Sequence, residues 1–334
     1  MSPTRIGIVG AGFMGSVHAA AWADCPDARL TAVVGGSGGP PARLAAEHGM
    51  RVCASLDELL DQVDVVDVCV PTDLHHEVTV RAARAGRAVV CEKPLARTPG
   101  EAADMIAVCR EAGVPLLPAH VVRFFPEYAA AKAAVDAGAI GEPAVLRLTR
   151  ASFQPAKPAG NWYLDEARSG GLHVDLMVHD LDYARWIAGE VVGVHARSLR
   201  AARPDAGTDH VLAILRHAPG AISHVEASWA QPPPTFRTRV EIAGTGGLLD
   251  FDSDGSAPVR PNLRAGAAAG PMPLPSSPLA VSPYAIQLRH FLDVVRGAAA
   301  PIVTADDALA AVRIATAIGR SIATGRPADV EVAA

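Results

Sequence analysis

The chain has 334 residues, of which 50% are hydrophobic and 19% are charged. That length is too great for one small core, and that balance is typical of a globular protein, so we expect two domains. The formal net charge of -5 offers no basic field for a nucleic acid backbone, and no apolar run is long enough to span a bilayer. Since the first residues also lack a signal peptide's apolar region, we expect a cytoplasmic protein.

Five cysteines are scattered through the chain, mostly inside apolar runs. Their odd number and wide spacing indicate neither a disulfide framework nor a zinc cluster, so we expect buried reduced thiols and no metal site. They are Cys25, Cys53, Cys69, Cys91 and Cys109.

The first 123 residues alternate short β-branched runs with helical stretches, which is the pattern of a parallel sheet covered on both faces. The predicted strands are Arg5–Val9, Leu30–Val34, Val63–Val70, Ala88–Cys91 and Val114–Leu117. Helices are predicted between them, one of them opening at Thr98, with Pro99 at its first position and Glu101 completing a capping box. We therefore predict an α/β nucleotide-binding domain over residues 1–123.

The second half changes character and predicts an α+β domain over residues 124–334. Helical stretches are expected at Pro126–Ala137, Leu172–Ile187 and Tyr284–Arg296, with another after Thr304. A strand is expected at Ala144–Thr149, and turn residues separate two strand pairs, which are His210–Leu215 with Ile222–Trp229 and Arg239–Ala243 with Gly247–Phe251. We expect an antiparallel arrangement with one face of the sheet open.

A G-x-G-x-x-G sequence follows the first predicted strand and opens the first helix. Gly10 would make the tight turn, Gly12 would let the backbone approach a pyrophosphate, and Gly15 would let helix and strand pack closely. The free N–H groups of the helix start, at Phe13 and Met14, would face the anion. This position in an α/β pattern predicts a dinucleotide site rather than a mere packing turn.

The end of the second predicted strand lacks the acid that usually holds the ribose of NAD. Val33 and Val34 lead into glycines, Ser37 and two prolines. Ser37 could bond a hydroxyl or a phosphate, so NAD and NADP both stay open as cofactors.

Charged and polar residues close the third and fourth predicted strands at the edge where open α/β sheets bind ligands. Glu92-Lys93-Pro94 ends the fourth, and Lys93 fits either a solvated strand end or a functional ammonium. Pro71, Thr72 and His75 close the third, where the backbone could line a nicotinamide, although most single residues in that turn have structural roles.

The predicted helix after Gly170-Gly171 carries an acid and a base on one face. At 3.6 residues per turn, Asp175, His179 and Asp182 fall together, whereas His173 and Asp180 point away. Oxidation of a secondary alcohol needs a group that takes the hydroxyl proton, and histidine titrates nearest neutral pH. A capped, hydrogen-bonded structural cluster is the alternative, while a metal site lacks a third ligand.

These motifs, in this order and spacing, resemble the Gfo/Idh/MocA oxidoreductases over nearly the whole chain. The resemblance implies a Rossmann domain, a C-terminal domain with a large, mainly antiparallel open-faced sheet, and NAD(P)-linked chemistry on sugars, sugar derivatives or inositols. It also implies a homodimer or homotetramer formed through the open face of the sheet. Two departures are the missing acid after the second strand and Leu172, where many members have a third glycine.

By position, the resemblance makes Lys93 the residue that contacts the reacting oxygen, Asp175 the acid and His179 the general acid/base. The cofactor would also contact Glu92 and Lys93 beside the glycine turn. Candidates for the substrate pocket are His120, Arg123, Asn161, Trp162 and Tyr163, each of which could instead serve packing. Abundant Ala, Gly, Pro and Arg suggest a GC-rich genome, compatible with sugar catabolism or with tailoring of an aminoglycoside-type intermediate.

Other functions remain open at this stage. One is an enzyme that oxidises its substrate transiently with a recycled bound cofactor, and another is a non-catalytic nucleotide-binding relative. Tyr128 and Lys132 match the Tyr-x-x-x-Lys pair of short-chain dehydrogenases, but the glycine spacing differs and no serine lies upstream near Val114, so we predict an ordinary helix pair.

Overall fold

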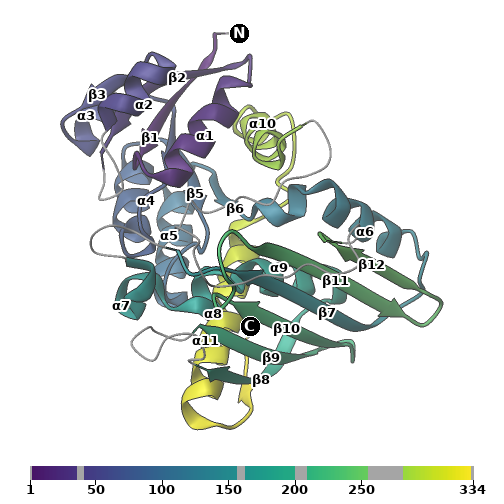
Figure 1. Cartoon of the computed structure of the whole chain (residues 1–334). Coiled ribbons are helices and arrows are strands. Elements are labelled where there is room, and N and C mark those ends of the chain that lie inside the picture. The colour runs from purple at the N-terminus through teal and green to yellow at the C-terminus, as the bar shows by residue number, and fades with distance from the viewer. Residues whose placement is uncertain (1, 36–40, 156–161, 200–208, 255–280, 332–334) are drawn as a thin grey trace. The chain divides into compact units, whose positions relative to one another are not determined.

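The computed structural model divides the chain into two compact units (Figure 1). The first comprises Met1–Phe125 and Ser277–Leu309, and the second comprises Pro126–Ser276 and Ala310–Ala334. The sequence predicted one boundary, after residue 123, and did not anticipate that a later segment returns to the first unit. The described residues are 2–35, 41–155, 162–199, 209–254 and 281–331.

The first unit contains a six-stranded parallel sheet in the order β3-β2-β1-β4-β5-β6. The strands are β1 (Thr4–Val9), β2 (Ala28–Val34), β3 (Arg51–Cys53), β4 (Val65–Val68), β5 (Ala88–Glu92) and β6 (Leu116–Ala119). The order reverses between β1 and β4, which is the switch point of a Rossmann domain. The predicted fold of this half is confirmed, although the three-residue strand β3 was not expected.

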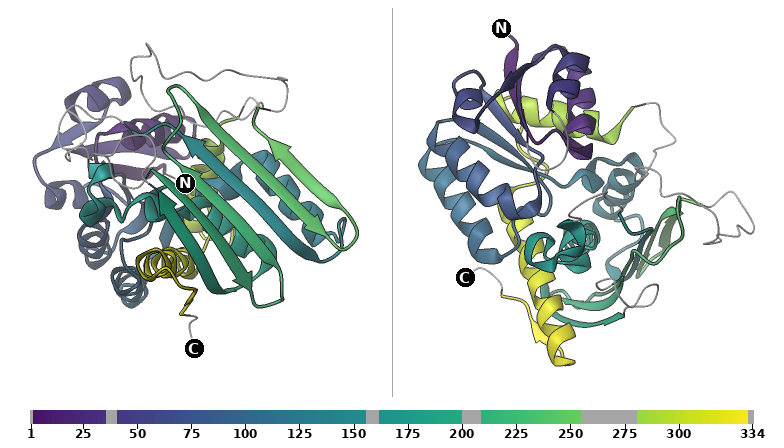
Figure 2. Two further views of the ribbon diagram at one scale, coloured as in Figure 1. Left: turned by 60° about the horizontal axis from the view of Figure 1, so that its bottom comes forward. Right: turned by 60° about the vertical axis from the view of Figure 1, so that its left-hand side comes forward.

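Helices cover both faces of this sheet (Figure 2). They are α1 (Phe13–Ala23), α2 (Pro41–His48), α3 (Leu56–Leu60), α4 (His75–Arg84), α5 (Pro99–Glu111) and α10 (Pro283–Val295), with short 3₁₀ turns η1 (Thr72–Leu74) and η2 (Val121–Phe124). One buried cluster contains Leu59 of α3 and Met105 of α5, and another contains Ala19 of α1 and Leu44 of α2. The predicted cap of α5 is confirmed, because the Thr98 hydroxyl accepts the Glu101 N–H at 3.2 Å.

The second unit contains a seven-stranded sheet in the order β12-β11-β7-β10-β9-β8-β13, antiparallel except for β7 beside β10. The strands are β7 (Pro143–Ser152), β8 (Val191–Leu199), β9 (His210–His217), β10 (Ile222–Ser228), β11 (Phe236–Gly244), β12 (Leu248–Asp252) and β13 (Ala328–Asp329). Along β9, buried Val211, Ala213 and Leu215 alternate with exposed Leu212 and Ile214. Because successive side chains point to opposite faces, one face is packed and the other is open.

Helices of the second unit lie along the packed face of its sheet (Figures 1 and 2). They are α6 (Pro126–Asp136), α7 (Glu166–Ser169), α8 (Leu172–Asp175), α9 (Val178–Ala188) and, from Ala310 on, α11 (Ala305–Thr324), with the short turn η3 (Trp162–Leu164). Both predicted strand pairs form, as β9 with β10 and β11 with β12. The predicted α+β domain with an open-faced sheet is therefore confirmed.

The helix predicted over Leu172–Ile187 was wrong in one respect, because it is broken into α8 and α9. The Met177 N–H bonds the Leu172 carbonyl, five residues back, at 3.1 Å, so the turn widens at this point. The wide turn means that a regular 3.6-residue period does not carry through Leu176 and Met177.

All five cysteines are free and buried, which confirms the thiols expected from their apolar surroundings. Among the described residues, no helix combines the length and the apolar character that crossing a membrane requires.

Candidate functional site

The glycine turn between β1 and α1 has the geometry that its sequence predicts. Gly10 has φ +106°, and a Cβ there would lie 2.5 Å from the carbonyl oxygen of Cys69. A Cβ on Gly15 would lie 2.0 Å from the carbonyl oxygen of Gly10. Both positions therefore require glycine, the first for its dihedral angle and the second for close packing of helix on strand. Gly12 caps the start of α1, where its approach to a pyrophosphate stays a prediction.

The first turn of α1 and the end of β2 complete the predicted nucleotide edge. Phe13 and Met14 are partly exposed at the helix start, and the Gly10 N–H donates to the Val34 carbonyl at 3.0 Å. Ser37, predicted to meet the ribose or its phosphate, lies outside the described residues.

Lys93 directly follows β5, in the loop that the sequence singled out. Its side chain is partly buried, and its main-chain N–H donates to Oε2 of Glu92 at 3.0 Å. The Glu92 side chain thus folds back onto the main chain of the next residue. A buried carboxylate holds the point from which the Lys93 side chain extends.

His75 joins this loop to the one that follows β4. Its ring nitrogens lie 2.9 Å from the Pro94 carbonyl and 3.0 Å from the Val70 carbonyl, and the side chain is 1% exposed. Burial lowers the pKa of His75. These bonds give His75 a structural task, whereas its predicted contact with a cofactor, like that of the buried Pro71 and Thr72, stays a prediction.

A buried polar network that the sequence did not single out lies beneath the Lys93 loop. His18 of α1 places Nδ1 at 2.9 Å from Oδ2 of Asp67 and Nε2 at 2.9 Å from Oε1 of Glu92. Trp22 Nε1 also donates to Asp67 Oδ2, at 2.7 Å. The detectable signal was Asp67 itself, because an acid inside the valine run of a central strand needs a buried partner.

In the second unit, Asp175 and His179 lie on either side of the break between α8 and α9. Asp175 is 6% exposed and Asp182 is 0% exposed, while His179 is partly exposed in the first turn of α9. The expectation that Asp175 shares one helix face with His179 assumed an uninterrupted helix. It does not apply across this break. The joint action of Asp175 and His179 therefore stays a prediction.

The two residues predicted to point away have partners of their own. Asp180 forms a two-pronged ion pair with Arg150 of β7, at 2.8 and 3.0 Å. His173 packs beside Gly319 of α11, where a Cβ would lie 3.0 Å from its Nε2, and burial lowers the pKa of His173 to about 4.

The turn ahead of α8 depends on both predicted glycines. Gly170 has φ +80° and Gly171 has φ +83°, and a Cβ on Gly170 would lie 2.7 Å from Val174. Just upstream, the rings of Trp162 and Tyr163 stack with centroids 4.0 Å apart. Their predicted contact with substrate is untested, and Asn161 lies outside the described residues.

Two further substrate candidates lie buried in the first unit. His120 is 1% exposed, immediately before η2. Arg123 is 3% exposed and donates to the Ile302 carbonyl at 3.0 Å and to Asp307 at 3.3 Å. Those bonds favour a structural role for Arg123, as a link between η2 and the segment that returns to this unit.

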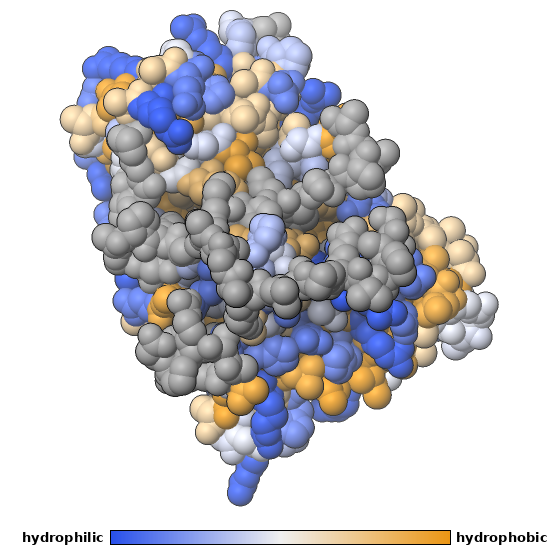
Figure 3. Space-filling model, in the orientation of Figure 1, coloured by the Kyte–Doolittle hydropathy of each residue, from blue (hydrophilic) through white to orange (hydrophobic). Residues whose placement is uncertain are grey.

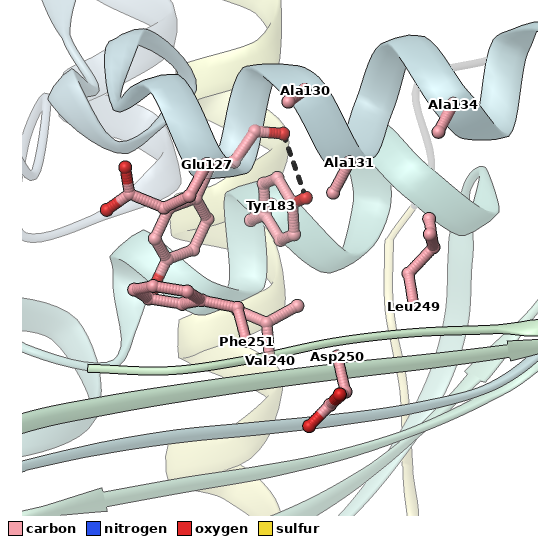
Figure 4. Close-up of a pocket in the computed structure, with 10 residues that line it drawn as sticks. Glu127, Ala130, Ala131, Ala134, Tyr183, Val240, Leu249, Asp250 and Phe251 are labelled. Carbon is pink, nitrogen blue, oxygen red and sulfur yellow. Dashed lines mark hydrogen bonds between the residues drawn. The ribbon is translucent and has the colours of Figure 1, made fainter. Parts of the chain in front are cut away.

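A pocket of about 280 Å³ lies within the second unit, between α6 and strands β11 and β12 (Figure 4). Tyr183 donates to the Tyr128 carbonyl at 3.1 Å in the wall of this pocket, and none of the predicted catalytic residues lines it.

Lys132 pairs with Asp136 and lies 5.3 Å from the Trp186 ring centroid. The Tyr128 ring packs edge-on against the Tyr183 ring, with centroids 4.9 Å apart, so the side chains of Tyr128 and Lys132 have separate partners.

Comparison with protein families matches both halves of the chain. Residues 4–120 match the oxidoreductase family with an NAD-binding Rossmann fold, and residues 128–250 match the GFO/IDH/MocA C-terminal domain. Inositol 2-dehydrogenase of Rhizobium meliloti (strain 1021) is 30% identical, with 98% of this chain and 99% of the relative covered. D-apiose dehydrogenase of Paraburkholderia graminis is 31% identical, over 97% of this chain and 89% of the relative.

Comparison with solved structures points to the same family of proteins. GenD2 from gentamicin A biosynthesis, in complex with NAD, has a TM-score of 0.87 and 29% identity, and the match covers 99% of this chain and 97% of that one. Levoglucosan dehydrogenase in complex with NADH and L-sorbose has a TM-score of 0.84 and 25% identity, with 100% of both chains covered. The chain belongs to the GFO/IDH/MocA family of oxidoreductases.

Proposed function

We propose that the chain is an NAD(P)-dependent dehydrogenase or reductase acting on a secondary alcohol or ketone of a sugar, aminosugar, sugar derivative or inositol. The observation that carries this proposal is the glycine turn at the switch point of the parallel sheet. There, Gly10 and Gly15 leave room that any side chain would fill. Such a turn suits the pyrophosphate of a dinucleotide, and when bound, the nicotinamide would accept or return the hydride.

Three side chains would share the remaining chemistry. The Lys93 ammonium would favour negative charge on the reacting oxygen, and the His179 imidazole would take the hydroxyl proton during oxidation. Asp175 would anchor a neighbouring hydroxyl or orient that imidazole. These roles come from the family motif.

The names of the relatives support a polyhydroxylated ring as the substrate. Their names include an inositol dehydrogenase, a levoglucosan dehydrogenase and a protein of gentamicin A biosynthesis. We therefore propose a cyclitol, an anhydrosugar or an aminosugar as substrate, with an aminoglycoside-type intermediate among them. The choice between NAD and NADP depends on the segment that contains Ser37.

The test is a screen that follows the absorbance of reduced nicotinamide. NAD⁺ and NADP⁺ are each combined with inositols, levoglucosan and aminosugars, and reduced cofactor should accumulate with at least one substrate. A product formed without net cofactor change would replace net dehydrogenation by transient oxidation. Neither product nor cofactor turnover across the panel, with cofactor bound, would favour a non-catalytic relative.

His179→Ala should lower turnover by about 10²-fold while leaving cofactor affinity nearly unchanged, because only the proton acceptor is lost. Turnover is measured by absorbance and cofactor affinity by protein fluorescence. His48→Ala, at the last position of α2, is the matched control and should keep full turnover. Full turnover in His179→Ala would remove His179 from the mechanism.

We also propose that a second copy of the chain covers the open face of the seven-stranded sheet. Figure 3 shows apolar surface among polar side chains in the region of β8–β10. There Ile214 is 48% exposed, Ile222 is 49% exposed and Leu199 is 60% exposed, and exposed apolar groups gathered on one face mark an interface. Location in the cytoplasm stays a prediction.

Sedimentation should show a dimer or tetramer, and Ile214→Arg should convert it to smaller species, because the change buries an unpaired charge at the interface. Arg239→Ala, on the more polar strand β11, serves as a second surface variant. It should weaken association less than Ile214→Arg does. A monomeric wild-type chain would contradict this assignment of the sheet face.

A further inference from the structure

The carboxylate of Glu92 connects Lys93 to a buried histidine within the first unit. Oε2 of Glu92 accepts the main-chain N–H of Lys93 at 3.0 Å, and Oε1 lies 2.9 Å from Nε2 of His18. His18 is 0% exposed and Glu92 is 6% exposed. Little water reaches either contact, so the position of Glu92 depends mainly on its protein partners.

The other side of the His18 ring also faces an acid. Nδ1 lies 2.9 and 3.0 Å from the two oxygens of Asp67, and the Cys69 thiol lies 3.5 Å from the same nitrogen. The phenol ring of Tyr284, from α10, lies 6.3 Å away between centroids. Two carboxylates on opposite sides of the buried ring favour its charged form, an imidazolium, over either neutral tautomer.

We propose that His18 is a positioning residue for Lys93: its imidazolium keeps Glu92 ionised and in place, and Glu92 fixes the main chain from which Lys93 extends. The catalytic part of this inference rests on the role of Lys93 in the proposed function. The network itself rests on the contacts among His18, Asp67 and Glu92.

The directions of the pKa shifts agree with this network. Burial alone would lower the pKa of His18, but the charge of Asp67, the neighbouring Cys69 and the bond to Asp67 raise it well above its ordinary value. Burial alone would raise the pKa of Glu92, but the bond to His18 and the charges of His18 and Lys93 lower it. The charge of His18 therefore stabilises the ionised form of Glu92, and Asp67 stabilises the charged form of His18.

Loss of the imidazolium should release this arrangement in a pH-dependent way. Without His18, two buried carboxylates would share the site with one cation fewer, so the pKa of Glu92 would rise. A protonated Glu92 holds the Lys93 N–H less firmly, because a neutral oxygen is a weaker acceptor. Lys93 would then lose its fixed position as the pH falls.

His18→Gln tests this dependence with a side chain that can bond but carries no charge. At about pH 8, turnover should fall about tenfold, with cofactor affinity nearly unchanged. As the pH is lowered to about 6, the ratio of variant to wild-type turnover should fall further, since Glu92 takes up a proton. The probes are NAD⁺ or NADP⁺ with the substrate that the panel identifies.

His217→Gln is the matched control. His217 is 1% exposed and has both ring nitrogens bonded, to the Gly189 carbonyl and the Ser223 hydroxyl, each at 2.7 Å, so the same change is made at equal burial. The ratio of His217→Gln turnover to wild-type turnover should stay constant with pH. A His18→Gln ratio that is equally constant would overturn the positioning role.

A double variant separates positioning from general damage to the core. In His18→Gln with Glu92→Gln, the amide oxygen at position 92 can accept the Lys93 N–H while its NH₂ group bonds the glutamine at position 18. Turnover should therefore be at least that of His18→Gln. If the two single substitutions lower turnover by factors that multiply in the double variant, as they would at independent sites, the inference is overturned.

Infrared spectroscopy gives a readout that needs no substrate. His18→Gln should show the carbonyl band of a protonated buried carboxyl group as the pH falls, and the added Glu92→Gln change should remove the part of that band that Glu92 carries, leaving any part that Asp67 carries. Absence of that band in His18→Gln would also overturn the inference. Lys93→Met distinguishes the two proposals: if it keeps full turnover, the proposed role of Lys93 fails, whereas if it is inactive and His18→Gln is unchanged, only the inference fails.

Discussion

Each unit places one predicted catalytic side chain next to a buried ion pair, and the two pairs differ in their cation. In the first unit, Glu92 precedes Lys93 and is held by His18. In the second, Asp180 follows His179 and is held by Arg150. The imidazolium of His18 can lose its proton when the pH rises through its raised pKa, whereas the guanidinium of Arg150 stays charged. The ion pair in the first unit is therefore sensitive to pH, whereas the ion pair in the second unit keeps its charges.

The pair in the second unit has the geometry of a rigid clamp. Arg150 is 2% exposed and Asp180 is 1% exposed, and both guanidinium contacts are hydrogen bonds. Burial would lower the pKa of Arg150, but the charge of Asp180 and contacts with Tyr128 raise it. The clamp ties β7 to α9, so it fixes the first turn of the helix that carries His179.

Removal of that clamp should have the largest effect on stability. Arg150→Met leaves the Asp180 carboxylate buried without its cation, which should cost about 3–5 kcal/mol and lower the thermal unfolding midpoint by roughly 10 °C. The loss should be similar at about pH 6 and pH 8, because arginine does not titrate there. Calorimetry at both pH values measures it.

Arg147→Met is the control on the same strand. Arg147 is 55% exposed and pairs with Glu241, so solvent screens the interaction and the cost should be at most about 1 kcal/mol. Equal losses from Arg147→Met and Arg150→Met would refute the clamp.

A smaller effect sharpens the contrast between the histidines of the two units. His18 has a raised pKa, whereas the pKa of His173 is lowered to about 4. The unfolded chain therefore binds a proton at position 173 that the folded chain does not, so stability is lost as the pH falls from about 6.5 towards 4. At about pH 5 this loss should be about 2 kcal/mol, and His173→Gln should abolish it.

Unfolding of wild type and His173→Gln at about pH 7 and pH 5 checks this expectation. An acid-induced loss of equal size in both proteins would show that another group causes it. For His18 the sign is opposite: its contribution is complete below about pH 6.5 and is lost as the pH rises through its raised pKa.

Local patterns in the sequence predicted the Rossmann domain, the paired strands and the glycine turn, because each depends on neighbours in the chain. The break at Leu176 and Met177 escaped prediction, since no glycine or proline marks it in the sequence. The His18 network escaped for another reason. Asp67 and Glu92 lie on different strands, and only the order of the sheet brings both to one ring.

The return of residues 281–309 to the first unit was equally hidden, because it depends on long-range contacts of α10 with α1 and η2. By contrast, Lys93 and His179 were singled out from the sequence and the family resemblance, and their roles stay predictions. Their shared action on one hydroxyl is the central claim.

The most direct test of that claim is turnover of Lys93→Met, His179→Ala and the double variant, measured with the same cofactor and substrate. Groups that act on one reacting oxygen are strongly non-additive, so the double variant should be little slower than the slower single variant. Single variants that retain full turnover, or two losses that simply multiply, would contradict the account.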